Sequence, residues 1–178
     1  GWNHNPDSTK WSLTKNPGHL RLMTAKVTND FTMARNTLTQ RPFAKRDQTI
    51  PTIATTKMDV RKMKDGDIAG LAVFQDPYAY IAVKQQKEKK SILMVNNGKV
   101  IGSAIINAST VYLRTLASNA TGKASFEYST DNKNFKPIGE DLMMRFSLKI
   151  FTGNKFCLFN YATKQEGGYV DFDWFRVD

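Results

Sequence analysis

Asp171 and Asp173, two carboxylates one residue apart near the end of the chain, are the pair best placed to carry chemistry. Alternate residues of a strand share one face, so both would lie on the same side of a sheet. Retaining glycanases use two carboxylates about 5–5.5 Å apart. The strand around this pair lacks the third acidic residue that sandwich-fold glycanases place nearby, which disfavours catalysis. The pair could instead bind calcium, which prefers hard oxygen ligands, or be a structural feature that faces water or pairs with Arg176.

The rest of the sequence contains no constellation typical of an enzyme. His4 and His19 are too far apart for a local metal motif. There is neither a Gly-x-Ser-x-Gly elbow nor a glycine loop that could hold phosphate. Cys157 is the single cysteine and lies in an apolar stretch, which predicts a buried, inert thiol and excludes an intramolecular disulfide. We therefore expect a chain that is not itself an enzyme.

Aromatic residues beside amide and guanidinium groups suggest a different function, the binding of sugar. An aromatic side chain covers the apolar face of a sugar ring, while Arg, Asn, Gln and Asp bind its hydroxyls. Tyrosine suits this role because its hydroxyl tolerates water. The predicted carbohydrate-contacting residues are Arg35, Gln40, Arg41, Gln75, Tyr78, Tyr80, Asn160 and Tyr161.

The competing interpretation is that strand aromatics form the core, since half of the positions on a half-buried strand face inward. The aromatic residues that we assign to the core first are Phe74, Phe126, Phe146, Phe159, Phe172 and Trp174.

Net charge raises the question of a nucleic-acid partner. The chain of 178 residues has 26 Lys and Arg against 16 Asp and Glu, a formal charge of +10. Clustered cations would neutralise phosphates, but here they are spread along the chain. The one dense run, residues 84–90, reads as a solvated turn after a strand, and no zinc-finger or RNA-recognition signature accompanies it. We therefore expect no nucleic-acid partner. With no apolar run of about 18 residues, we also expect no membrane span.

Short alternating runs, separated by Gly, Asn and Asp clusters, predict an all-β fold. Asn97-Gly98 is a favoured pair for a tight hairpin turn. About a dozen strands require two packed sheets, so we predict one antiparallel β-sandwich of jelly-roll type over residues 1–178. The predicted strands span residues 18–22, 37–41, 52–60, 68–74, 78–83, 91–95, 99–106, 110–117, 124–129, 143–151, 156–161 and 168–177.

Several ordered blocks of the sequence resemble the C-terminal β-sandwich that follows the five-bladed propeller of glycoside hydrolase family 43 β-xylosidases and α-L-arabinofuranosidases. The resemblance covers nearly the whole chain. An opening strand with an acidic-acidic-Phe pattern, which family members carry, is missing, and the start at Gly1 suggests a processed or excised piece. The matching blocks are residues 2–7, 11–13, 17–22, 34–41, 54–59, 66–71, 151–153 and 167–176.

This resemblance implies a concanavalin-A-like sandwich whose catalytic partner is the propeller. Some such sandwiches are classed as xylan-binding modules, which implies xylan or arabinoxylan as ligand and a secreted, periplasmic or cell-surface location. In the β-xylosidases an aromatic residue from a sandwich loop helps to shape the propeller's pocket, and Phe151 in Phe-Thr-Gly resembles that position. A structural calcium is also implied, with Asp173 as the first ligand to test. Two functions stay open: glycan binding, or structural support of the propeller without glycan binding.

Overall fold

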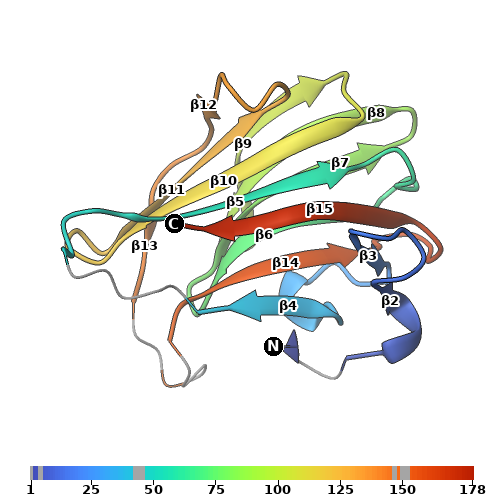
Figure 1. Cartoon of the computed structure of the whole chain (residues 1–178), viewed down its shortest axis with the longest axis horizontal. Coiled ribbons are helices and arrows are strands. Elements are labelled where there is room, and N and C mark those ends of the chain that lie inside the picture. The colour runs from blue at the N-terminus through green and yellow to red at the C-terminus, as the bar shows by residue number, and fades with distance from the viewer. Residues whose placement is uncertain (1, 4–5, 42–46, 146–147, 149–152) are drawn as a thin grey trace.

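The structure is a computed structural model that describes residues 2–3, 6–41, 47–145, 148 and 153–178. Two antiparallel β-sheets stack face to face (Figure 1), which confirms the predicted all-β sandwich. The first sheet has seven strands in the order β1 (Trp2–Asn3), β4 (Thr37–Gln40), β14 (Lys155–Tyr161), β6 (Ile68–Phe74), β7 (Ala79–Gln86), β8 (Lys89–Asn96) and β9 (Lys99–Ile106).

The eight-stranded sheet packs against the first one. Two short 3-10 helices, η1 (Ser8–Lys10) and η2 (Phe31–Met33), lie in the connections between strands, and no helix of the described chain is long and apolar enough to cross a membrane. The order of this sheet is β12 (Lys136–Pro137), β11 (Lys123–Ser129), β10 (Thr110–Ser118), β5 (Thr52–Asp59), β15 (Tyr169–Val177), β3 (Leu20–Met23) and β2 (Trp11–Ser12), with β13 (Leu142–Met143) paired to β11.

Two predicted segments differ from the observed strands. The basic run at residues 84–90 is not one long turn, because β7 continues to Gln86 and β8 begins at Lys89, so only two residues turn. The strand predicted from Met143 is limited to β13, and part of the predicted range lies outside the described residues. The predicted hairpin at Asn97-Gly98 is confirmed: both residues have positive φ, 48° and 87°, which matches the right-handed twist of the flanking strands.

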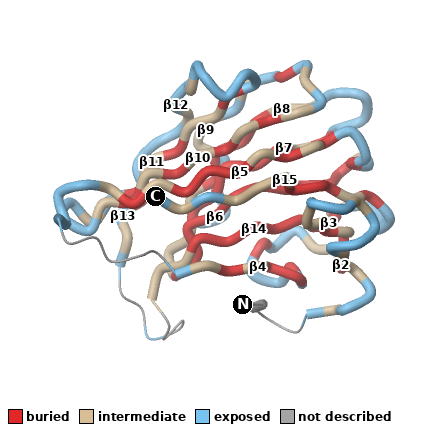
Figure 2. Tube along the Cα trace, viewed as in Figure 1, coloured by how far each residue is buried: buried red, intermediate tan, exposed pale blue. Residues whose placement is uncertain are grey.

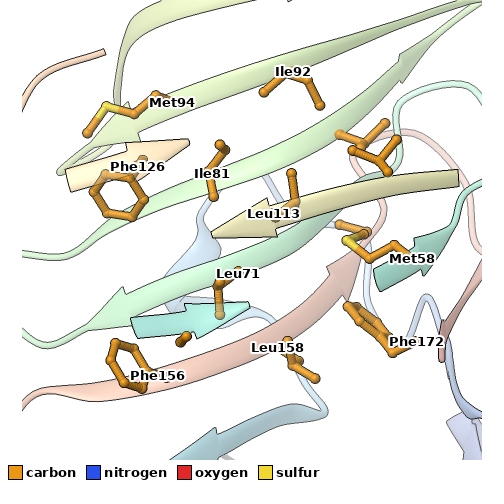
Figure 3. Close-up of a cluster of buried hydrophobic side chains, with 14 of the residues drawn as sticks. Met58, Leu71, Ile81, Ile92, Met94, Leu113, Phe126, Phe156, Leu158 and Phe172 are labelled. Atoms are coloured by element: carbon orange, nitrogen blue, oxygen red, sulfur yellow. The ribbon is translucent and has the colours of Figure 1, made fainter. Parts of the chain in front are cut away.

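The main core lies between the two sheets and is built from alternate residues of facing strands. Burial stabilises the fold because each such side chain removes apolar area from water, which contributes about 25 cal/mol of free energy per Å². Figure 2 shows the buried positions along the central strands, and Figure 3 shows how their side chains meet. Among the largest core residues are Met58, Leu71, Ile81, Ile92, Met94, Leu113, Phe126, Phe156, Leu158 and Phe172.

Strand β6 is buried on both of its faces. All seven of its residues are buried, because Leu71 faces the core between the sheets while Ala72 and Phe74 belong to a second apolar cluster on the other side. A continuous apolar run such as residues 68–74 is typical of a strand that is buried on both faces. The core assignments of Phe126 and Phe172 are confirmed; Phe74 and Phe159 are buried in the second cluster, and Phe146 lies outside the described residues.

A β-bulge in β15 changes which of its residues face the core. The pairing with β5 shifts between Phe172 and Trp174, so Asp173 is the extra residue. Before the bulge Phe172 is in the core, and beyond it Phe175 packs against the core instead of Trp174. The assignment of Trp174 to the core is therefore wrong, because simple alternation fails at a bulge.

Asp67 is a buried carboxylate at the end of the sandwich. Its side chain is fully buried; Oδ2 accepts a hydrogen bond from the Lys64 backbone N–H at 2.8 Å, while Oδ1 has no partner among the described residues. Burial disfavours the charged form and raises the pKa of Asp67 to about 6, against the opposing effect of the Lys64 hydrogen bond. The folded chain therefore holds this proton more tightly than the unfolded chain does.

Asp67→Asn should change how stability depends on pH. Between about pH 4 and pH 6 the native carboxyl stays protonated while the unfolded one ionises, so Asp67 makes the wild type lose stability as pH rises through this window. The free energy of unfolding of the variant, relative to wild type, should rise across the window by on the order of 3 kcal/mol and then level off. Urea unfolding at several pH values measures this difference.

Asp65→Asn is the matched control for that measurement. The pKa of Asp65 is lowered by hydrogen bonds from the Lys164 side chain and the Lys87 backbone, so its contribution to stability is lost as pH falls. The free energy of unfolding of Asp65→Asn relative to wild type should therefore change with pH in the opposite direction to that of Asp67→Asn. A difference between Asp67→Asn and wild type that does not vary with pH would contradict the assignment.

Candidate functional site

Two of the predicted sugar-contacting tyrosines are buried rather than exposed. Tyr80 and Tyr161 are 4% and 2% exposed and lie on the face of the seven-stranded sheet that points away from the core. Their hydroxyls are 3.3 Å apart, within hydrogen-bond distance. Burial raises the pKa of Tyr161 to about 12 and also raises that of Tyr80. Both side chains are therefore covered, and neither ring offers an open face to a sugar in this structure.

Phe31 is the residue that closes this face. It lies in η2, whose first turn is capped by Asp30 accepting from the Thr32 N–H at 2.9 Å, and it is 2% exposed. Aromatic pairs at these spacings add favourable edge-to-face and tilted contacts to the area that they bury. The Phe31 ring centroid lies 4.7–6.5 Å from the centroids of five other rings. Together with Phe31 these rings form what we call the outer aromatic cluster: Phe74, Tyr78, Tyr80, Phe159 and Tyr161.

Tyr78 is the one predicted tyrosine that stays partly exposed. It is stacked on Tyr80 with ring centroids 6.3 Å apart and an interplanar angle of 5°. Half-burial against the cluster raises its pKa to about 12. A sugar ring could reach Tyr78, but the neighbouring tyrosines are covered, so the three do not form one open platform.

The predicted polar contacts are not brought together either. Gln75 and Asn160 are buried, and Asn160 Nδ2 donates to the Leu22 backbone oxygen at 2.8 Å, across the core. Asn160 and Tyr161 are adjacent on β14, so they point to opposite faces of the sheet. Arg35 and Arg41 are exposed in separate loops, and Gln40 Nε2 donates to the Arg41 backbone oxygen at 3.1 Å.

Asp171 is held by cationic and amide groups. Arg21 donates to both of its oxygens, at 2.7 and 2.8 Å, and Asn16 donates to Oδ2 at 2.9 Å. Burial alone would raise the pKa of this carboxyl, but the hydrogen bonds from Arg21 and Asn16 outweigh it and lower the pKa. The Arg21 guanidinium also lies 3.9 Å from the centre of the Tyr169 ring.

Asp173, the bulge residue, binds a different cation. Lys57 Nζ donates to it at 2.7 Å and His19 Nε2 lies at 3.8 Å; the Lys57 hydrogen bond lowers the pKa of this carboxyl. The described residues include no group of three or more acidic, His or Cys side chains that could hold a metal. With Asp171 and Asp173 each compensated by its own cation, this donor set does not fit calcium, which needs six to eight oxygen ligands.

The outward face of the eight-stranded sheet carries an aromatic and cationic surface that the sequence interpretation missed. The bulge turns Trp174 onto this face, where its ring centroid lies 6.0 Å from that of Tyr112 at 46°. Both rings are partly exposed. We call this surface the open face and define it by Trp174, Lys57, Tyr112, Arg176, Thr55 and Arg114, which are cross-strand neighbours on β15, β5 and β10.

Guanidinium groups lie on aromatic rings at two places on the open face. Arg176 Cζ is 4.4 Å from the Trp174 ring centre, and Arg114 Cζ is 3.5 Å from that of Phe135. The alternation of β10, with Tyr112 and Arg114 between buried Val111, Leu113 and Thr115, was a signal in the sequence that could have found part of this surface. The bulge gave no such signal.

A second distinctive surface lies at one end of the sandwich. Ile50, Met143 and Leu148 are exposed there by 51%, 48% and 77%. A cavity of about 220 Å³ at this end is lined by Thr52, Val73, Ala117, Asn119, Met144, Asn154 and Lys155. Phe151, the predicted contact with a catalytic module, lies outside the described residues.

Comparison with known proteins identifies the family of the chain. The family model for the β-xylosidase C-terminal concanavalin A-like domain matches residues 1–178. The chain belongs to this family. A β-xylosidase of Formosa agariphila is 35% identical over 199 residues; the match covers 99% of this chain and 32% of the relative, so the chain spans about a third of that protein's length. The resemblance noted from the sequence is confirmed.

Solved structures of glycoside hydrolase family 43 (GH43) proteins contain the same sandwich. A bifunctional GH43-CE protein of Bacteroides eggerthii has a TM-score of 0.93 and 40% identity, covering 99% of this chain and 23% of that one. A GH43 enzyme engineered for endo-xylanase and exo-arabinofuranosidase activity has a TM-score of 0.90 and 34% identity, covering 99% and 37%. A GH43 protein of Bacillus licheniformis has a TM-score of 0.82 and 26% identity, covering 99% and 36%.

Phe31→Ala should destabilise the sandwich strongly. Removing this ring leaves a cavity against five aromatic neighbours, and buried Phe→Ala changes cost about 3–5 kcal/mol. Met33→Ala, in the same 3-10 helix but 39% exposed, is the matched control and should cost under about 1 kcal/mol. Urea unfolding measures both. A loss below about 1 kcal/mol for Phe31→Ala would show that η2 is not a fixed cover of the outer aromatic cluster.

Proposed function

We propose that the chain is a non-catalytic module of a family 43 glycoside hydrolase that binds xylan-type hemicellulose, xylan or arabinoxylan, on its open face. The observation that carries this is the pair of partly exposed rings, Trp174 and Tyr112, on a sheet face that also bears guanidinium, ammonium and hydroxyl groups. Such a surface offers an apolar patch to a sugar ring and hydrogen-bond donors to its hydroxyls. A polysaccharide outside the cell would be met by a secreted, periplasmic or surface-bound protein.

The names of relatives support the choice of glycan. The Formosa agariphila relative is a β-xylosidase, and one structural neighbour is described as an engineered endo-xylanase and exo-arabinofuranosidase. Both names point to xylan backbones or their arabinose side groups. The corrected position of Trp174 moves the proposed site away from Tyr80 and Tyr161, which are buried, to the opposite sheet.

Trp174→Ala should abolish most of the glycan affinity. Central aromatic contacts often dominate binding, so we expect the dissociation constant for xylan to rise about tenfold or more. Retardation on native gels that contain soluble xylan measures this, with thermal unfolding as a check of the fold. Tyr78→Ala, a partly exposed aromatic on the other sheet, is the control and should leave retardation unchanged. Absence of retardation of the wild type by any hemicellulose would contradict the proposal.

A second function, support of a catalytic propeller, is favoured by the apolar end of the sandwich. Ile50, Met143 and Leu148 would be covered if a partner module docked there. Phe151, in the segment that follows Leu148, is the residue that we propose helps to shape the propeller's pocket. This role does not compete with glycan binding, since it uses a different surface.

Leu148→Asp, made in a protein that carries both this chain and its propeller, tests the support function. A charge at a covered apolar contact weakens docking, so kcat/KM for a xyloside should fall about tenfold, as it should for Phe151→Ala. Ile105→Asp is the matched control, because Ile105 is 79% exposed and Leu148 is 77% exposed. Unchanged kinetics in both Leu148→Asp and Phe151→Ala would contradict the support function.

A further inference from the structure

The open face contains two arginines in one cross-strand row. Arg176 on β15 and Arg114 on β10 are both register partners of Thr55 on the intervening strand β5. Neighbouring strands are about 4.8 Å apart, so the backbones of the two arginines are separated by about 10 Å, with a short side chain between them. Thr55 itself is buried, and Arg114 Nε donates to its hydroxyl at 3.4 Å, so a ligand would meet the remaining guanidinium N–H groups of Arg114 and those of Arg176 above this residue.

Two other cations on the outward side of the eight-stranded sheet, Arg21 on β3 and Lys57 on β5, are already compensated by carboxylates. Arg21 pairs with Asp171 at 2.7 Å and Lys57 pairs with Asp173 at 2.7 Å. Arg114 has only a long contact with Glu127, at 3.7 Å. Exposed Arg176 forms no ion pair with a carboxylate of the described residues. The surplus positive charge of the open face therefore lies at the row of Arg176 and Arg114.

Both arginines are held in place by aromatic rings rather than by acids. The Arg176 guanidinium lies on Trp174 and the Arg114 guanidinium on Phe135, at 4.4 and 3.5 Å from the ring centres. Stacking occupies a face of the guanidinium plane and leaves its N–H donors in the plane able to bind an anion. Arginine binds carboxylates well because its donors form a planar fork that can bind two oxygens at once.

The cationic row lies directly beside the aromatic row. Trp174 and Tyr112 precede Arg176 and Arg114 by two residues on their strands, a distance of about 7 Å along each strand. A ligand that fits both rows has a neutral pyranose that lies on the aromatic rings. It also has a carboxylate on the neighbouring sugar unit, which reaches the arginines. Among xylans, this chemistry belongs to chains with uronic-acid side groups.

We propose that the open face selects acidic, uronic-acid-substituted xylan over neutral xylan, with Arg176 and Arg114 binding the carboxylate and Trp174 and Tyr112 contacting the neighbouring sugar ring. This inference rests on the proposed function and adds the class of substituent that is recognised. It also gives a role to the two arginines, since among the described residues Arg176 forms no ion pair and Arg114 has only the 3.7 Å contact with Glu127.

Glucuronoxylan and the same polymer after chemical reduction of its carboxyl groups are the matched ligands for the test. Dissociation constants come from affinity electrophoresis or calorimetry with the 178-residue chain, at low and at moderate salt. We expect about tenfold tighter binding of the acidic polymer, with a preference that weakens as salt rises. Arg176→Gln with Arg114→Gln should remove the preference while binding of the reduced polymer persists. Lys99→Gln, which removes an exposed charge at the start of β9, is the control and should keep the preference.

The outcomes separate this inference from the proposed function. Equal affinity for the two polymers would overturn the acidic preference and leave xylan binding intact. No binding of either polymer would overturn both. A preference that survives in the double arginine variant, or that Lys99→Gln reduces as much, would show a general effect of net charge and would overturn the assignment to Arg176 and Arg114. Circular dichroism of each variant shows whether the fold is retained, and the single Arg176→Gln variant repeats the test if the double variant unfolds.

Discussion

Both sheets must bury every second side chain of their central strands in one shared core, and this requirement determines where the chain can carry function. The residues between the sheets are committed to packing. Only the outward faces and the ends of the sandwich remain available for ligands or partners. The outward face of the seven-stranded sheet is covered by a second apolar cluster around Phe31 over β6, β7 and β14, while β9 at its edge stays largely exposed. The open face of the eight-stranded sheet is the outward surface on which partly exposed aromatic rings and arginines lie together.

The sequence predicts the core better than it predicts the surface. The strand pattern, the buried strand β6 and the hairpin at Asn97-Gly98 follow from local alternation and turn chemistry, and the structure confirms them. Contacts between distant segments do not follow from local pattern. Phe31 covers Tyr161 across 130 positions of sequence, so the tyrosines that looked exposed are buried. A single extra residue at Asp173 reverses the alternation of β15, which placed Trp174 on the wrong face.

Pairing of charges on the eight-stranded sheet favours the structural interpretation of the acidic residues of β15 over catalysis or calcium binding, the three alternatives that the sequence left open. Asp171 and Asp173 are separated by the bulge, and each carboxylate is matched to one cation from a neighbouring strand, Arg21 or Lys57. A carboxylate that is already bound by a guanidinium group has a lowered pKa and little capacity to serve as a general acid or a metal ligand. The compensation is uneven along the strand, however: the charge of Arg176 contributes to lowering the pKa of Asp173, but within the described part of the chain Arg176 forms no ion pair of its own.

Distance along the strands allows the open face and the apolar end to be used at the same time. Tyr112 lies near the start of β10, whereas Ala117 and Asn119, which line the cavity at the apolar end, lie at and beyond its other end. Seven residues of strand separate Tyr112 from Asn119, about 23 Å at 3.3 Å per residue. A catalytic module docked on Ile50, Met143 and Leu148 could therefore leave the Trp174 and Tyr112 rings uncovered. The arginine row is the part of the open face nearer to the apolar end, since Arg176 pairs with Thr55 while Thr52 already lines the cavity. A sugar chain that lies along β15 from Trp174 past Arg176 thus points toward the end where the propeller would dock.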